Sequence, residues 1–204
     1  AYVDPDPRTL RLMINTYYQS LTAYKASIAP SFQSLLQEAY TKWRGASNYI
    51  ANTLLCEAYA RNFNIAHGTT MTGAGVPNLF KNLKEKGYAI HLLLCYASDA
   101  TRMHALTSRA THQAFVQNSP EDAITKGKVF HTIFPLYFKN ADRINLYWTD
   151  DATPDGTNEF KGLSVCAATY EQTTGLVVHD QEAFNKFVAK YDEDRNGNGL
   201  SFNE

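Results

Sequence analysis

Apolar residues follow two patterns along this chain. From Ser31 to Asn62 they return every three or four positions, which is typical of a helix with one buried face. Pro30 precedes this segment and Ser31 can cap its first turn. Tyr88 to Ala97 is instead a near-continuous apolar run, the pattern of a strand buried on both faces of a parallel sheet.

The other segments alternate between helical and strand-like patterns. We expect further helices over about 8–18, 77–87, 98–113, 120–139 and 182–191, and strands over 63–66, 143–148, 163–170 and 176–179. Gly87 is a natural end for the second of these helices, and Gln172–Gly175 reads as the turn of a hairpin or edge pair. Strands that alternate with helices predict an α/β fold with a mostly parallel sheet flanked by helices. We predict one core over residues 1–191, with a loop over 149–161, a hairpin or edge strands over 162–180, and an acidic tail over 192–204.

Composition narrows the expected partners. The 204 residues are 44% hydrophobic with a formal net charge of −1, which suits a packed domain and argues against nucleic acid as a partner. No stretch approaches 18 continuous apolar residues, so we expect no membrane partner. The three cysteines stand apart in apolar surroundings without metal-ligand spacing. They are typical of reduced core thiols, and hence of a protein in the cytoplasm or delivered into the cytosol of a target cell.

The start of the chain and a missing phosphate-loop motif both bear on whether sequence precedes Ala1. The sequence opens with Ala1 rather than Met, and Tyr2–Val3 resembles the end of a strand, which indicates sequence upstream, although a processed terminus gives the same pattern. The phosphate-loop motif G-x-x-x-x-G-K-[ST] does not occur. The Gly127–Lys128 pair lies in an expected helix without glycines before it. A nucleotide-binding loop of that type would therefore lie outside this sequence.

Three polar segments follow expected strands, and ligands of parallel α/β sheets bind beyond the carboxyl ends of the strands. They are Asp4/Asp6, His67–Thr70 and the loop after Tyr96. Asp4 and Asp6 could take a proton from a substrate hydroxyl or hold Mg²⁺. The alternative, which the two residues taken alone favour, is an ordinary acidic turn that caps the helix beginning near Arg8.

The segment His67-Gly68-Thr69-Thr70 offers a second set of candidate substrate contacts. Gly68 allows a close backbone approach, and the hydroxyls of Thr69 and Thr70 can hydrogen-bond to a polar ligand. The alternative is a strand-to-loop turn in which His67 has a structural bond. As a metal ligand His67 is weak, because no second ligand stands at a suitable spacing nearby.

Cationic side chains on two expected helices could act on a phosphoryl group. Arg102 and Arg109 stand seven positions apart and therefore share a helix face, and Lys126 and Lys128 lie on the following helix. Phosphoryl transfer needs cations around the transferring oxygens. The alternative for each of these residues is an ordinary solvated charge.

The end of the chain carries oxygen-bearing side chains at alternate positions, like a calcium-binding loop. Asp192, Asp194, Asn196 and Asn198 would be the ligands. The register fails, because Glu204 stands at position 13 counted from Asp192 and at position 11 counted from Asp194, rather than at position 12. The pattern favours an acidic tail over a calcium site.

Several segments, taken in order over about 1–150, resemble zeta-toxin-type P-loop kinases. Val3-Asp4-Pro5-Asp6 is similar to the family's strand and acidic pair, and His67-Gly68-Thr69 stands where the family has Glu-Gly-Thr. The other similar segments are Lys84–Tyr88, Asn118–Ile124 and the A-D-R entry Ala141–Tyr147.

The resemblance implies a three-layer P-loop kinase fold, here lacking its first strand and phosphate loop. It implies ATP and Mg²⁺ as cofactors, a small hydroxylated acceptor such as a UDP-N-acetyl-sugar, and an antitoxin or other protein as a partner. It assigns Asp6 as the base and Thr69 as a substrate contact, with the arginines and lysines above as phosphate clamps. Because the phosphate loop is missing, the fragment should be inactive alone. The alternative is a non-catalytic pseudokinase or interaction module that binds a nucleotide sugar or a protein.

Overall fold

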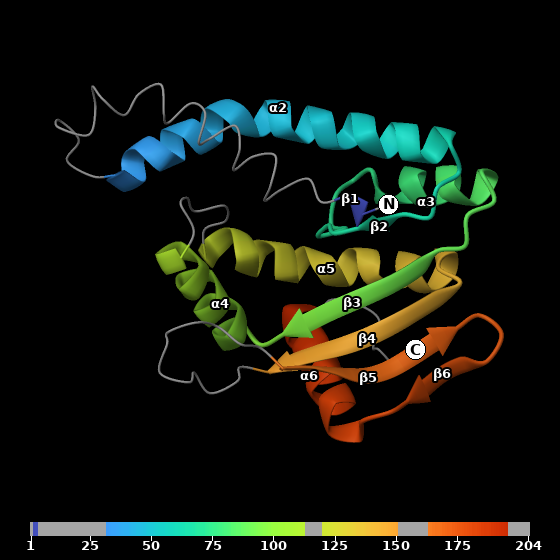
Figure 1. Ribbon diagram of the computed structural model, residues 1–204. Helices are drawn as coiled ribbons and strands as arrows, with labels where there is room; N and C mark the ends of the chain where they lie inside the picture. Colours follow the sequence, from blue (N-terminus) through green and yellow to red (C-terminus); the bar gives the residue numbers. More distant parts are fainter. Residues whose placement is uncertain (1, 4–31, 113–119, 151–162, 196–204) are drawn as a thin grey trace. The chain divides into compact units, whose positions relative to one another are not determined.

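The computed structural model describes residues 2–3, 32–112, 120–150 and 163–195 (Figure 1). The chain divides into two compact units. One comprises residues 1–70 with 113–117, and the other comprises 71–112 with 118–204. Each unit is described by itself.

The first unit contains helix α2 (Phe32–Ala60) and two short parallel strands, β1 (Tyr2–Val3) and β2 (Ala66–His67). Helix α2 confirms the helix predicted from the apolar periodicity. Local hydrogen bonds explain where this helix ends. Asn62 adopts a positive φ of 55°, and the N–H groups of Asn62 and Phe63 donate to the carbonyls of Tyr59 and Ala58 at 3.3 and 3.0 Å. These two bonds satisfy carbonyls that the helix end leaves open. Strand β2 begins at Ala66, later than the expected 63–66.

The second unit is built on a mixed four-stranded sheet in the order β3-β4-β5-β6. The strands are β3 (His91–Ala97), β4 (Arg143–Asp150), β5 (Leu163–Glu171) and β6 (Gly175–Val178). Strands β3 and β4 pair in parallel, while β4–β5 and β5–β6 are antiparallel. The α/β class is confirmed, but the expectation of a mostly parallel sheet is wrong for these four strands. The expected hairpin accounts for part of the difference, since a tight turn joins antiparallel strands directly.

Four helices accompany this sheet: α3 (Val76–Glu85), α4 (Asp99–His112), α5 (Pro120–Asn140) and α6 (Gln181–Arg195). Figure 1 shows α6 behind the sheet. The largest buried side chains come from α3, α5, α6 and β4 and form one core; they include Phe80, Tyr137, Phe187, Ile144 and Leu146. The core therefore lies between the sheet and the helices on one of its faces.

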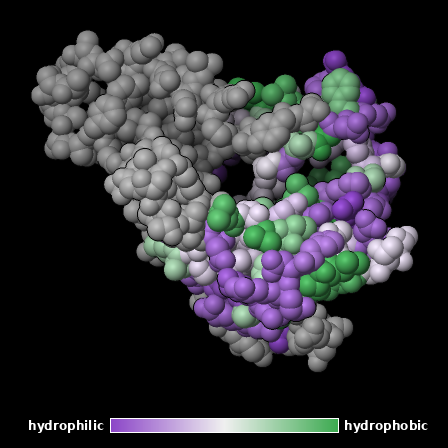
Figure 2. Space-filling model, turned by 60° about the horizontal axis from the view of Figure 1, so that its bottom comes forward, coloured by the Kyte–Doolittle hydropathy of each residue, from purple (hydrophilic) through white to green (hydrophobic). Residues whose placement is uncertain are grey.

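The other face of the sheet departs from the expected two-sided burial of β3. Leu93 is 68% exposed and Cys95 is exposed, because side chains of a strand alternate between the two faces. Cys56 is also exposed and Cys166 is half-buried, so the three thiols are free but do not belong to the core. Figure 2 shows apolar patches interrupted by polar side chains; the exposed apolar residues of β5 and β6 are Leu163, Val165, Leu176, Val177 and Val178.

Two turns set the position of the elements around the core. Gly87 follows α3 and has a positive φ of 77°. The N–H groups of Gly87 and Tyr88 donate to the carbonyls of Lys84 and Leu83 at 2.9 and 3.0 Å. This pattern confirms Gly87 as the end of the helix. Asp180 caps α6, since its Oδ1 accepts the Ala183 N–H at 2.9 Å.

Within the described residues, no helix combines the length and the apolar character that crossing a membrane requires.

Candidate functional site at the carboxyl end of strand β3

The polar site of the second unit begins where β3 ends and α4 starts. Ser98 caps α4, because its Oγ accepts the Thr101 N–H at 3.1 Å and contacts Thr101 Oγ1 at 3.0 Å. This cap holds Asp99 and Arg102 on the first turn of α4, directly after the strand. Ligands of α/β sheets bind at this end of a parallel strand.

Helix α6 brings two further charged side chains to the same place. Lys190 and Asp194 are one helical turn apart, and each is 4% exposed. The Lys190 Nζ donates to Asp194 Oδ1 at 2.7 Å and to Asp99 Oδ2 at 3.0 Å. It also donates to the more exposed Glu193 at 3.3 Å. One buried ammonium group therefore joins α6 to the start of α4.

Tyr96 and Arg102 complete this group. The Tyr96 hydroxyl donates to Asp194 Oδ2, and the Arg102 Nη2 lies 3.7 Å from the same oxygen. Arg102 also pairs with Asp99, and its guanidinium carbon lies 5.7 Å from the centroid of the Tyr96 ring. We call Tyr96, Asp99, Arg102, Lys190 and Asp194 the buried ion cluster.

The surroundings of Tyr96, Asp99 and Lys190 shift the pKa values of these three groups. Burial and the hydrogen bond to Asp194 raise the pKa of Tyr96, so it stays a neutral donor. Burial opposes the charged form of Lys190, but the bonds to Asp194 and Asp99 outweigh it and raise its pKa. Burial likewise opposes the charged form of Asp99, but Lys190 and Arg102 lower its pKa. At neutral pH Tyr96 is thus neutral, Lys190 is a cation and Asp99 is a carboxylate, with the more exposed Glu193 at the rim of the cluster.

The carboxyl end of β4 is tied to the same helix. Asp150 accepts the Trp148 Nε1–H at 2.6 Å and the Lys186 ammonium at 3.0 Å. Lys186 is one turn before Lys190, and it also pairs with Glu182 at 3.0 Å. Two lysines on successive turns of α6 therefore pair with carboxylates at the ends of two adjacent parallel strands.

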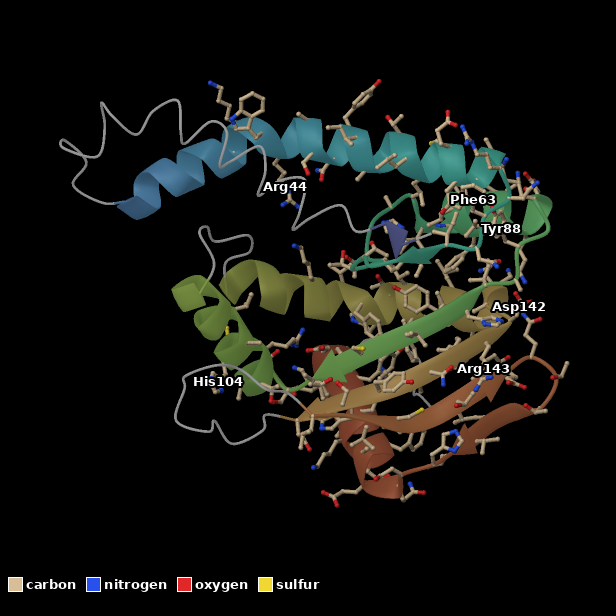
Figure 3. The ribbon with its side chains drawn as sticks, in the orientation of Figure 1. Arg44, Phe63, Tyr88, His104, Asp142 and Arg143 are labelled. Atoms are coloured by element: carbon tan, nitrogen blue, oxygen red, sulfur yellow. The ribbon has the colours of Figure 1, made fainter. Side chains whose placement is uncertain are left out.

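The opposite end of this strand pair holds a different acid. Asp142 accepts the Lys84 ammonium and the Ile90 N–H, each at 2.6 Å, and these bonds lower its pKa. Figure 3 shows Asp142 and Arg143 where β4 begins, and Arg143 lies 3.6 Å from Glu171. The A-D-R segment thus joins the turn after α3 to the sheet and lies away from the buried ion cluster.

The predicted site residues have different places. Arg102 belongs to the buried ion cluster, and Lys126 is half-buried on α5. The side chains of Arg109 and Lys128 lie outside the described part, as do Asp4 and Asp6. His67, Gly68, Thr69 and Thr70 belong to the first unit, at and after β2.

The tail residues are partly helical. Asp192 and Asp194 lie on α6, which continues to Arg195 beyond the expected end at 191, while Asn196 and Asn198 are outside the described residues. Asp194 is bound by Lys190 and Tyr96. Across the residues that the structure describes, no group of three or more His, Cys, Asp or Glu could hold a metal ion.

Sequence reasoning missed Tyr96, Lys190 and Asp194 as members of a common site. A local signal existed for Lys190, which stands between Phe187 and Tyr191 on the apolar face of α6. A lysine within an apolar stripe needs a buried partner. The partner at Asp99 is 91 positions away, so the sequence alone does not identify it.

No family model matches this chain, and no curated protein or solved structure matches it either. The resemblance to zeta-toxin-type kinases therefore stays a hypothesis carried by the sequence segments that suggested it.

Proposed function

We propose that this chain is the acceptor-binding part of a zeta-toxin-like, ATP-dependent phosphotransferase. Its substrate would be a hydroxyl group of a small molecule such as a UDP-N-acetyl-sugar. The observation that carries the proposal is the edge of β3, which pairs with β4 on one side and with no strand of the described sheet on the other.

Strand β3 has the sequence of an interior strand. Its seven residues, HLLLCYA, are largely apolar and contain no proline, lysine or arginine to protect an edge. Interior strands of parallel sheets have this composition. A further parallel strand at this edge would carry its following loop to the carboxyl end of β3, beside the buried ion cluster. In the proposed enzyme that strand carries the phosphate-binding loop and completes a three-layer P-loop architecture.

The described residues alone do not fit ATP and Mg²⁺. Arg102, a predicted phosphate clamp, is neutralised by Asp99 and Asp194, and the chain lacks a phosphate-loop motif. The nucleotide and metal would therefore depend on the added strand. The proposed roles of this chain are then those of the acceptor side: Asp6 as base, with Asp4, His67, Gly68, Thr69 and Thr70 around the acceptor and Arg109, Lys126 and Lys128 as clamps.

A second candidate is a non-catalytic module that binds a nucleotide sugar or a protein partner. The engagement of Arg102 by two carboxylates favours it, because an arginine held this way does not reach a transferring phosphoryl group. His67 in place of the family's Glu favours it as well.

The test compares the 204-residue chain with the product of the whole coding sequence that contains it. Each is incubated with ATP, Mg²⁺ and UDP-N-acetylglucosamine, and sugar phosphate is measured by mass spectrometry. We expect product from the longer protein alone, and loss of product in its Asp6→Asn variant. Binding of the nucleotide sugar without turnover by either protein would support the second candidate. A longer protein that lacks a phosphate-binding loop would rule out the kinase.

A further inference from the structure

We propose that Tyr96, Arg102 and Lys190 form a binding site for a phosphate-class anion, and that Asp194 of the same chain occupies this site. The last turn of α6 then acts as an internal competitor for the external anion. This inference does not depend on phosphotransfer, because it concerns anion binding by the 204-residue chain itself.

The first argument is the convergence of three different donors on one carboxylate. Lys190 Nζ lies 2.7 Å from Asp194 Oδ1, the Tyr96 hydroxyl donates to Oδ2, and the Arg102 Nη2 is 3.7 Å from Oδ2. Ammonium, guanidinium and phenol groups are the donors that bind phosphate and carboxylate oxygens. The Asp194 carboxylate therefore has the place that an anionic ligand would take.

The second argument is location. The donors gather at the carboxyl end of β3 and at the first turn of α4, where ligands of α/β sheets bind. The amino-terminal end of a helix also favours negative charge. Asp99 is one negative group at this helix end, since it lies in the first turn of α4. Its Oδ2 accepts a hydrogen bond from the Lys190 Nζ at 3.0 Å.

The third argument is that Asp194 can leave while the donors stay. It is the penultimate residue of α6, and helix ends open more readily than helix centres. Lys190 is one turn earlier and remains paired with Asp99 when the last turn opens. Tyr96 and Arg102 belong to β3 and α4. When Asp194 leaves, Asp99 is the one remaining member of the cluster that opposes the charges of Arg102 and Lys190, so the cluster has a net positive charge that attracts a phosphate anion.

The experiment measures binding of inorganic phosphate by titration calorimetry at constant ionic strength. Asp194→Asn keeps the shape of the side chain and removes the competing charge, so we expect phosphate to bind at least tenfold more tightly than to the original chain. Asp192→Asn is the matched control, because it removes the same charge from a side chain that is 49% exposed. Adding Arg102→Gln to Asp194→Asn should abolish the gain.

A measurement on the unaltered chain covers the case in which Asp194→Asn does not fold. Phosphate should lower the protection of the backbone N–H groups of residues 191–195 from hydrogen exchange, while sodium chloride at the same ionic strength should not. Equal phosphate affinity of the Asp194→Asn and Asp192→Asn chains would overturn the proposal. So would a gain that survives Arg102→Gln, or hydrogen exchange at the end of α6 that phosphate leaves unchanged.

Discussion

Replacing Lys190 by methionine tests the energetics of the buried ion cluster. Methionine keeps an unbranched stem but removes the ammonium group that binds Asp99 and Asp194. Lys190 and Asp194 are each 4% exposed, so the substitution leaves a buried carboxylate without its closest cation. Removing one partner of a buried pair costs about 3–5 kcal/mol. We expect Lys190→Met to lower the free energy of unfolding by about that amount.

The same substitution at Lys186 is the matched control. Lys186 lies one turn earlier on α6 and also pairs with two carboxylates, those of Asp150 and Glu182. Its side chain is 42% exposed, and water and salt screen exposed pairs of this kind. Lys186→Met should therefore lower the free energy of unfolding far less than Lys190→Met does.

Urea denaturation, followed by tryptophan fluorescence, provides the assay. Trp148 lies in β4 and is 5% exposed, so it reports on the second unit, and a Trp43→Phe background removes the signal from α2. With a slope of about 2 kcal/mol per molar urea, a loss of about 3 kcal/mol lowers the midpoint by about 1.5 M. Midpoints of Lys190→Met and Lys186→Met within about 0.3 M of each other would refute the reasoning, since Lys190 would then behave as a solvated charge.

Two further predictions concern backbone and acid stability. Hydrogen bonds from Lys84 and the Ile90 N–H lower the pKa of Asp142 in the folded state, so its stabilising contribution is present above its unfolded pKa of about 4 and is lost as pH falls through the folded pKa. Asp142→Asn should therefore lower the urea midpoint at pH 7 and make it less sensitive to pH below about 4; an unchanged acid limb would contradict this. Gly87→Ala should destabilise the protein by about 1–2 kcal/mol, because Gly87 has a positive φ of 77° that alanine disfavours. Gly45→Ala within α2 should instead stabilise it by about 0.5–1 kcal/mol, since no atom of the described residues lies near the added Cβ and alanine favours the helix. Thermal melts in which the two substitutions shift the midpoint in the same direction would contradict this reasoning.

Local signals in the sequence predicted much of the fold. Helix α2 was expected over 31–62 and runs from Phe32 to Ala60, and β4 was expected over 143–148 and runs from Arg143 to Asp150. Gly87 was expected to end α3, and it does so with a positive φ. These successes share a cause, because apolar periodicity and helix ends depend on residues within a few positions of one another.

The candidate site depends on contacts that no local pattern encodes. Tyr96 and Asp194 are separated by 98 positions, and Lys190 and Asp99 by 91. The calcium-like spacing of Asp192 and Asp194 also has a helical explanation. Side chains two residues apart on a helix point in directions about 160° apart, so Asp194 is buried while Asp192 is exposed. Alternation at this point of the sequence therefore carries little information about a loop.

A double substitution separates stability from ligand binding as the reason for the cluster. A buried ion pair replaced by apolar residues of similar volume is often as stable or more stable, because the replacement removes the desolvation of both charges. In Lys190→Met/Asp194→Leu, Asp99 and Arg102 still pair with each other, so the remaining charges are balanced. We expect the free energy of unfolding of this variant to lie within about 1 kcal/mol of that of the original chain, and well above that of Lys190→Met alone. If it does, stability does not account for the two buried charges, and anion binding at Tyr96 and Arg102 becomes the stronger explanation. A double variant as unstable as Lys190→Met would instead assign the cluster to folding.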